Sequence, residues 1–257
     1  MSASSRQLSP YEHNHLRKHG VNPDQIERYG EMPVEYITGK VEFAGLEFMV
    51  TPATLIPRVE TEELVHKALA AAEKWCNSFP QQAITIIDIG TGSGAIGISL
   101  GVKLEQRQLP YQLYLSDLSP DALAVAHQNA AHLLHQSPTH IESNLWQNID
   151  ATLQFDMITA NLPYIPHQRM PDLEPSVKEF EPWLALDGGP TGLELITTLV
   201  EGLDQHLSAY GVAWLELDDT HTPSVIDKAF SQSKSHLSWT NHQDHFDKNR
   251  FVEVKRI

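Results

Sequence analysis

The sequence predicts an α/β protein built on an open, mostly parallel, doubly wound β-sheet. From about residue 60 onward, segments with helical spacing of apolar residues alternate with short runs rich in β-branched residues, which is typical of successive βα units. The run 83–89 is apolar or β-branched almost throughout, as expected of a strand that helices cover on both faces. Ligands of such sheets bind beyond the carboxyl ends of the strands, and both distinctive motifs of this chain follow predicted strands.

Each element follows from a local pattern. The first helix of the sheet region is predicted to have Thr61 as its N-cap, because two glutamates then occupy the first turn. A later helix opens with Ser119 followed by Pro120, a capping side chain and a proline at the first helical position. The predicted strands are 83–89, 111–116, 155–160, 211–217 and 250–256. After the first helix, a second helix is predicted to follow the glycine loop and to end at 104, and three others to span 119–134, 193–207 and 223–230.

The chain before the sheet divides into two short regions. Residues 1–32 are polar and contain a Gly-Val-Asn-Pro turn signal, so we expect one or two short helices without a core of their own. Residues 33–54 are expected to be a linker, because apolar residues alternate with polar or small ones over 34–50 in the pattern of a β-hairpin. The remainder, 55–257, is predicted to be the α/β domain.

Composition limits the partners and the compartment. The formal net charge is −15 and Lys and Arg form no run, whereas binding to phosphates needs a basic surface, so direct contact with nucleic acid is not expected. No stretch approaches the roughly eighteen unbroken apolar residues of a membrane span, and no signal peptide is visible. The single cysteine, Cys76, favours a reducing cytoplasm. The histidines lack the paired spacing of a metal site, so no metal is predicted.

A glycine-rich loop follows the predicted strand 83–89 and enters a helix. Glycines there allow a sharp turn and the close approach of a ligand to the backbone. Gly92, Gly94 and Gly97 fit the dinucleotide fingerprint, and Asp117 follows about twenty residues later. A nicotinamide dinucleotide is therefore one candidate ligand.

S-adenosylmethionine is the favoured ligand of this loop. The strand runs straight into Gly90, so the glycines alternate from that residue onward, and Asp88 stands at the loop entrance. A carboxylate there would repel a pyrophosphate but favours the cationic sulfonium and amino groups of S-adenosylmethionine. Asp117 ends the next strand, where a carboxylate can accept hydrogen bonds from both hydroxyls of a ribose.

The second motif, Asn161-Leu162-Pro163-Tyr164, directly follows a predicted strand. Methyl transfer to nitrogen requires acceptors that hold its N–H bonds and orient its lone pair, and the Asn161 side-chain oxygen and Leu162 carbonyl can supply two. Pro163 stiffens the turn, and Tyr164 offers a flat face to a planar amide or base. Since transfer of a methyl group from a sulfonium needs little acid–base help, positioning should supply most of the rate.

Several blocks of this sequence resemble the HemK/PrmC-type glutamine-N5 methyltransferases, which modify peptide chain release factors. The most specific block is Ile56-Pro57-Arg58-Val59-Glu60-Thr61-Glu62, at the entrance to the α/β domain. The other blocks are 33–39 with Phe43, 88–96, 117–123, 161–166, and 181–193.

The resemblance implies a Rossmann-like S-adenosylmethionine-dependent methyltransferase sheet, preceded by a short N-terminal helical segment and a β-hairpin. Residues 55–257 would be the catalytic domain and 1–32 a shortened substrate-recognition segment. The implied partner is a release factor, whose Gly-Gly-Gln glutamine amide would be held by Asn161, with Leu162 and Pro163 shaping the acceptor backbone and Tyr164 packing on the amide. The expected methyl-donor residues are Asp88, Gly90, Thr91, Gly92, Gly94, Asp117, Leu118, Asn144, Leu145 and Asn161.

Three departures from the family pattern keep alternatives open. Leu162 replaces a usual proline, Asn144 replaces a usual acidic residue, and the N-terminal region is short. A leucine in the motif also occurs in rRNA adenine-N6 dimethyltransferases, so adenine-N6 methylation of RNA or DNA is one alternative. A non-catalytic binding module with a methyltransferase fold is the other. Arg58 and Glu60 either line the site or bridge the hairpin to the sheet.

Overall fold

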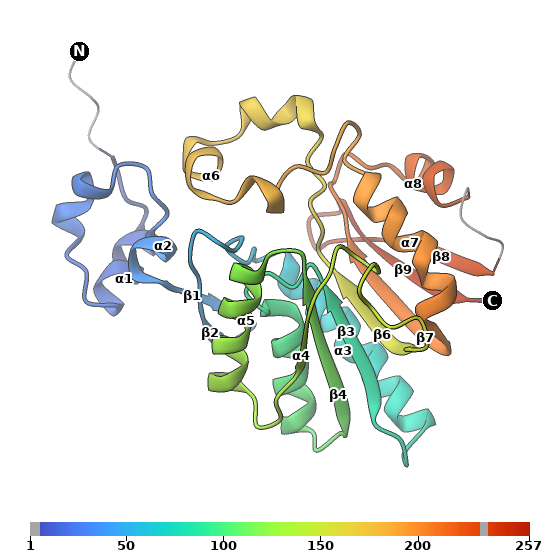
Figure 1. Ribbon diagram of the computed structural model, residues 1–257. Helices are drawn as coiled ribbons and strands as arrows, with labels where there is room; N and C mark the ends of the chain where they lie inside the picture. The colour runs from blue at the N-terminus through green and yellow to red at the C-terminus, as the bar shows by residue number, and fades with distance from the viewer. Residues whose placement is uncertain (1–5, 232–235) are drawn as a thin grey trace.

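The computed structural model describes residues 6–231 and 236–257. Its central feature is a seven-stranded β-sheet (Figure 1). The strand order is β5-β4-β3-β6-β7-β9-β8. The strands are β3 (Ile84–Ile89), β4 (Tyr111–Asp117), β5 (Thr139–Glu142), β6 (Phe155–Ala160), β7 (Leu207–Glu216), β8 (Leu237–Gln243) and β9 (Asn249–Arg256). The pairs from β5 to β7 are parallel, and β9 pairs antiparallel with both β7 and β8. The predicted fold class is confirmed.

Two strands were not predicted, and both lie at the edges of the sheet. β5 has the sequence Thr-His-Ile-Glu with no residue fully buried, and β8 alternates polar residues with few apolar ones. Edge strands are half solvated, so they lack the continuous apolar signal that identifies a central strand such as β3.

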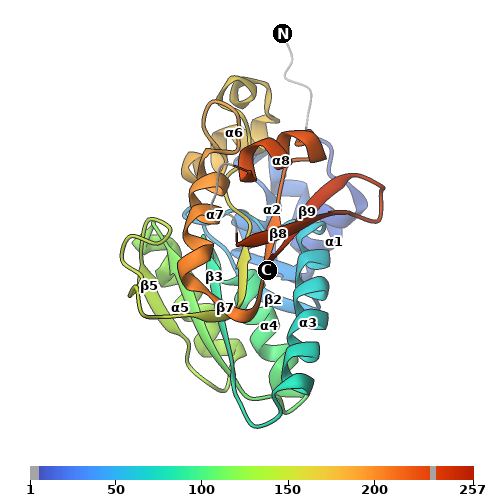
Figure 2. The ribbon, with the colours of Figure 1, turned by 90° about the vertical axis from the view of Figure 1, so that its right-hand side faces the viewer.

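Helices cover both faces of the sheet (Figure 2). One face packs against α3 (Thr61–Ser78), α4 (Ala95–Gln106) and α5 (Pro120–Leu133), and the other against α7 (Glu194–His206) and α8 (Pro223–Phe230). Strand side chains alternate between these two cores, since Ile86 packs in the first and Ile87 in the second. Each such residue is fully buried, which stabilises the fold by about 1.5–3 kcal/mol per side chain.

The N-terminal region differs from the prediction in two respects. Residues Val34–Thr38 form the helix α2 instead of a strand, and a small core of Leu16, Ile26 and Val34 joins it to α1 (Pro10–Lys18) and η1 (Pro23–Tyr29). Gly39 ends α2 in the left-handed conformation, which glycine adopts without steric cost. Residues 1–5 of the expected segment 1–32 lie outside the described residues.

The hairpin is shorter than predicted and comprises β1 (Lys40–Phe43) and β2 (Leu46–Met49). Its two turn residues, Ala44 and Gly45, have φ of 51° and 78°, as a tight two-residue hairpin turn requires. The Tyr36 hydroxyl donates a buried 2.6 Å hydrogen bond to the Thr54 carbonyl, which fixes the linker to the start of the α/β domain.

The segment between β6 and α7 contains three short helices that the sequence did not indicate. They are η2 (His167–Asp172), α6 (Pro175–Phe180) and η3 (Trp183–Ala185). In Figure 1 this segment lies above the carboxyl ends of the strands. Among the described residues, no helix is both long and apolar enough to cross a bilayer.

Candidate functional site

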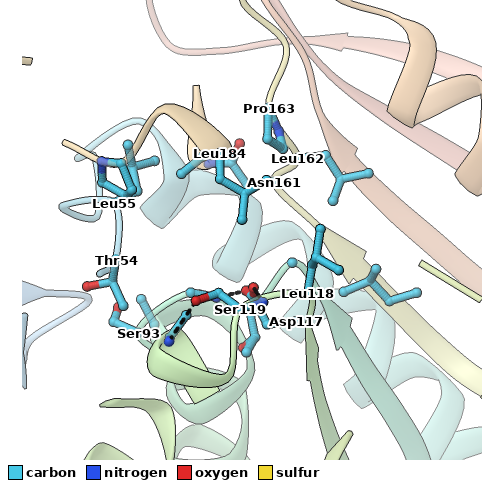
Figure 3. Close-up of a pocket in the computed structure, with 18 of the residues that line it drawn as sticks. Thr54, Leu55, Ser93, Asp117, Leu118, Ser119, Asn161, Leu162, Pro163 and Leu184 are labelled. Carbon is cyan, nitrogen blue, oxygen red and sulfur yellow. Dashed lines mark hydrogen bonds between the residues drawn. The ribbon is translucent and has the colours of Figure 1, made fainter. Parts of the chain in front are cut away.

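A pocket of about 280 Å³ lies at the carboxyl ends of β3, β4 and β6. Figure 3 shows Thr54 and Leu55 on one side of this space and Asn161 and Leu162 on the other, with Asp117 below. It therefore joins the glycine loop to the Asn-Leu-Pro-Tyr motif in one cavity. Of the sequence-predicted site residues, those that line it are Gly90, Thr91, Gly92, Asp117, Leu118, Asn144, Leu145, Asn161, Leu162 and Pro163.

Asp88 does not line the pocket, contrary to the expected contact with the methyl donor. Its side chain is buried beneath the glycine loop, where it accepts hydrogen bonds from Thr91 Oγ1 (2.6 Å), Thr159 Oγ1 (2.7 Å) and the Gly97 N–H (3.1 Å). Burial raises the pKa of Asp88 to about 6, although these three hydrogen bonds lower it. Asp88 thus holds the two ends of the loop together. Gly94 also lies outside the lining and is the N-cap of α4.

Asp117 lies at the pocket floor with both carboxylate oxygens facing backbone donors. Oδ2 accepts from the Gly92 N–H at 2.8 Å and Oδ1 from the Ser119 N–H at 2.9 Å. Burial raises the pKa of Asp117, and the N–H groups of Ser119 and Gly92 oppose that shift. A carboxylate has about four acceptor positions, so each oxygen can still accept a hydroxyl from a ligand.

Glycines in the loop after β3 adopt backbone conformations that other residues rarely adopt. Gly90 and Gly92 have φ of 69° and 55°, conformations that a side chain disfavours. A Cβ on Gly90 would lie 2.7 Å from Leu162 Cδ2. The loop and the Asn-Leu-Pro-Tyr motif are therefore in van der Waals contact at this point.

Asn129 was missed in the sequence, where it is an ordinary residue of a predicted helix. Its side-chain amide accepts from the Met49 N–H (2.7 Å) and donates to the carbonyls of Met49 (3.0 Å) and Ser93 (2.8 Å). Asn129 is 2% exposed, and its hydrogen bond to the Ser93 carbonyl is fully buried. Asn129 thereby ties the hairpin to the glycine loop, a contact that no local pattern could reveal.

Asn161 is oriented by a residue of the specific sequence block. Its Nδ2 donates to Thr61 Oγ1 at 3.2 Å, which leaves Oδ1 free to accept from a ligand. Thr61 is the first residue of α3 and not its N-cap, a position that Glu60 occupies. The threonine hydroxyl is thus available to Asn161 because it does not cap the helix.

Leu162 and Tyr164 are both held by packing against the sheet. Leu162 is 5% exposed and belongs to the core on the α7 face, so buried contacts hold its side chain. Tyr164 does not line the pocket. Its hydroxyl lies 3.4 Å from Glu216 Oε1, at the end of β7, and its pKa is raised by burial.

The segment after β6 closes one side of the pocket through Pro182, Leu184 and Ala185. It is attached by an ion pair of 2.7 Å between Arg58 and Glu181, whose side chain is 1% exposed. Neither Arg58 nor Glu60 lines the pocket. Arg58 instead bridges the specific sequence block to this covering segment.

Several groups that line the pocket are chemically suited to S-adenosylmethionine. Asp117 offers carboxylate oxygens for hydroxyls, and the loop glycines admit a ligand close to the backbone. Leu118 is 46% exposed beside Leu145 at the pocket wall, an apolar surface that suits a planar base. In the described ranges, no three His, Cys, Asp or Glu side chains are grouped to hold a metal ion.

Known proteins match most of this chain. A family model described as the methyltransferase small domain matches residues 70–174. The release factor glutamine methyltransferase of Geobacter sulfurreducens is 38% identical over 216 residues, which are 80% of this chain and 70% of that protein. The protein of the same name from Lactococcus lactis is 35% identical over 223 residues, or 87% of this chain and 77% of that protein.

This chain belongs to the release factor glutamine methyltransferase family. A human member, the MTRF1L release factor glutamine methyltransferase, is 30% identical over 89% of this chain and 69% of its own length. Family and fold together imply the use of S-adenosylmethionine.

Solved structures support the fold assigned to the family. The hMettl16 catalytic domain superposes with a TM-score of 0.56 at 17% identity, covering 82% of this chain and 75% of that chain. A ribosomal protein L11 methylase from Lactobacillus delbrueckii gives a TM-score of 0.52 at 17% identity, with 77% and 80% covered. At such identities the likeness concerns the methyltransferase fold alone.

Proposed function

We propose that this protein methylates the side-chain amide of the glutamine in the Gly-Gly-Gln loop of a peptide chain release factor. The observation that carries the proposal is the orientation of Asn161, whose Nδ2 is engaged by Thr61 at the rim of the pocket. An amide nitrogen has N–H bonds to donate, and the free Oδ1 of Asn161 is an acceptor suited to one of them. The names of the relatives at 30–39% identity support the same substrate.

S-adenosylmethionine, when bound, supplies a methyl group activated by its sulfonium. Asp117 would accept the ribose hydroxyls, Gly90 and Gly92 would give the ligand access to the backbone, and Leu118, Asn144 and Leu145 would surround the base. Asn161 and the Leu162 carbonyl would each accept one N–H of the glutamine amide, so that its lone pair points into the pocket. Pro163 shapes the turn, and Tyr164 stabilises it from the sheet side. Positioning of this kind can supply a large part of the rate.

Neither alternative gains support from the pocket or the relatives. Of the described residues that line the pocket, none is Lys, Arg or His, whereas Asp117 and Asp121 are acidic. An adenine-N6 methyltransferase would need cations near its target to contact phosphates. The family members that match most of the chain are named as glutamine methyltransferases, which disfavours the binding module.

A direct assay tests the proposal. Purified protein is incubated with S-adenosylmethionine and a release factor, and the peptide that contains the Gly-Gly-Gln loop is analysed by mass spectrometry. We expect one methyl group on the glutamine, and none when that glutamine is replaced by alanine. Turnover of S-adenosylmethionine with an unmodified glutamine peptide would contradict the proposed substrate.

A further inference from the structure

Glu216 is a buried carboxyl group that the mechanism above does not use. It ends β7 and is 1% exposed. Burial raises the pKa of Glu216 to about 7, and hydrogen bonding from Thr61, the charge of Arg250 and hydrogen bonding from Tyr164 lower it. A buried carboxyl costs free energy unless nearby groups use its charge, so its neighbours indicate what it does.

Those neighbours are Tyr164, the last residue of the acceptor motif, and Thr61, which contacts its first residue, Asn161. The Tyr164 hydroxyl lies 3.4 Å from Oε1, and the Thr61 hydroxyl is close enough to lower the pKa of the carboxyl. The second carboxyl oxygen, Oε2, is buried and has no hydrogen-bond partner among the described residues. Thr61 in turn accepts from Asn161 Nδ2 at 3.2 Å. Glu216 thus contacts Tyr164 directly and is connected to Asn161 through Thr61.

We propose that Glu216 and Thr61 are positioning residues that determine which end of the Asn161 amide faces the methyl acceptor. A threonine hydroxyl has one proton and two acceptor positions. When that proton points to the Glu216 carboxylate, Thr61 presents only lone pairs to Asn161. The asparagine must then turn Nδ2 toward Thr61 and leave Oδ1 for the acceptor N–H. The inference rests on the proposed function for its consequence but not for its geometry.

Protonation of Glu216 would remove this constraint. A neutral carboxyl can donate to Thr61 Oγ1, which frees the threonine proton to bond Asn161 Oδ1 and to turn the amide over. The charged and titratable groups that act on Glu216 are Arg250, from β9, Glu60, beside α3, and Tyr164. Arg250 is paired at 3.2 Å with Asp244 and stays cationic over the relevant range. Glu216 is therefore the group whose ionisation controls Thr61.

Substitutions of Thr61 test the first part of the proposal. Thr61→Val keeps the shape but removes the hydroxyl, and we expect kcat to fall about tenfold or more with little change in the KM for S-adenosylmethionine. Thr61→Ser restores the hydroxyl and should retain most of the activity. Thr198→Val, on the exposed side of α7, is the matched control and should behave as wild type. Equal activity of the valine and serine variants would overturn the proposal.

Glu216→Gln tests the second part, because glutamine resembles the protonated acid and cannot ionise. We expect the wild-type kcat to rise with pH through a midpoint near 7, and the variant to lack that rise. Glu201→Gln, on the exposed surface of α7, should keep the wild-type profile. Asp88, whose pKa is about 6, is unchanged in both variants, so its titration cannot explain a difference. An unaltered pH profile in Glu216→Gln would refute the role of Glu216.

A measurement without any acceptor separates this inference from the proposed function. In 15N-labelled protein the Asn161 side-chain NH2 signals are assigned by their loss in Asn161→Ala. We expect them to shift with pH near 7 in the wild type, to lose that dependence in Glu216→Gln, and to move in Thr61→Val but not in Thr198→Val. If release factor is not methylated but these shifts occur, only the substrate proposal fails. If the Asn161 signals change in neither Thr61→Val nor Glu216→Gln, the positioning proposal fails whatever the substrate.

Discussion

The two sides of the pocket are each anchored by a buried carboxylate, and the two anchors differ. On the proposed methyl-donor side, Asp88 accepts three hydrogen bonds of 2.6 to 3.1 Å, two of them from the loop and helix that directly follow its strand. On the proposed methyl-acceptor side, the Tyr164 hydroxyl lies 3.4 Å from Glu216 Oε1, and Oε2 has no hydrogen-bond partner among the described residues. The donor side is thus a closed network of short bonds, whereas the acceptor side is held by long contacts between distant parts of the chain.

This difference fits the two tasks. A methyl donor is the same molecule in every turnover, so a rigid local loop can be shaped to it in advance. A protein acceptor must enter, and catalytic hydrogen bonds commonly tighten only when the reacting complex forms. We therefore expect substitutions on the donor side to reduce the affinity for S-adenosylmethionine and the stability of the fold. Substitutions on the acceptor side should reduce turnover.

The largest expected effect is on the acceptor side. Asn161→Ala removes the side-chain acceptor at the reacting nitrogen, and kcat should fall roughly a hundredfold to a thousandfold, as when one positioned group of a transition-state site is deleted. Calorimetry should show S-adenosylmethionine binding near the wild-type affinity, because the donor network is intact. Loss of donor binding together with turnover would show that the two sides are not separable.

The donor-side counterpart is Asp88→Ala. It leaves the hydroxyls of Thr91 and Thr159 and the N–H of Gly97 without their partner in a buried space, at about 1–3 kcal/mol for each unsatisfied group. The free energy of unfolding in urea should fall by about 3 kcal/mol or more, and donor affinity should fall with it. Asp172→Ala, at an exposed position outside the pocket, is the control for stability. A stable Asp88→Ala protein that binds the donor normally would contradict the role assigned to Asp88.

The pH dependence of stability tests whether Glu216 ionises in its buried position. The folded pKa of Glu216, about 7, exceeds its ordinary value of 4.5. Below pH 4.5 both states hold the proton; as the pH rises toward 7 the unfolded chain ionises first, so stability is lost over this window. Glu216→Gln should lack a loss of at most about 3.5 kcal/mol, the product of that shift and ~1.4 kcal/mol per unit. Urea titrations at pH 4.5 and 8 measure it, and an equal decrease in both proteins would argue against a buried ionising Glu216.

Local patterns predicted the donor side better than the acceptor side. The strand β3, its glycine loop and Asp117 are contiguous or lie at neighbouring strand ends, so periodicity and strand order place them together. The Thr61–Asn161 and Tyr164–Glu216 contacts join residues 100 and 52 positions apart. Only the packed sheet brings these residues into contact, which is why Glu216 and Asn129 gave no sequence signal. The inward direction of Asp88 was also unpredictable, since a residue at a strand end can face either layer.

In the N-terminal region, residues 34–38 form a helix, although the alternation of apolar and polar residues predicted a strand. Residues 34–38 alternate like a strand, yet Pro33 precedes them, Gly39 ends the helix in the left-handed region, and Thr38 Oγ1 bonds back to the Val34 carbonyl at 2.9 Å. Packing of Val34 against Leu16 and Ile26 then favours the helix. A five-residue element has too few periods for sequence alone to distinguish helix from strand.

The smallest expected effect concerns the point where the two sides touch. Gly90→Ala places a Cβ 2.7 Å from Leu162 Cδ2 and strains a residue at φ 69°. Gly45→Ala, at φ 78° with no atom within 4 Å of the added Cβ, measures the backbone strain alone, about 1 kcal/mol. Donor affinity should fall only in Gly90→Ala, and the double variant with Leu162→Ala should recover about 0.5–1 kcal/mol of the lost binding free energy. Strict additivity of the two substitutions would mean that the donor loop and the acceptor motif do not influence each other through this contact.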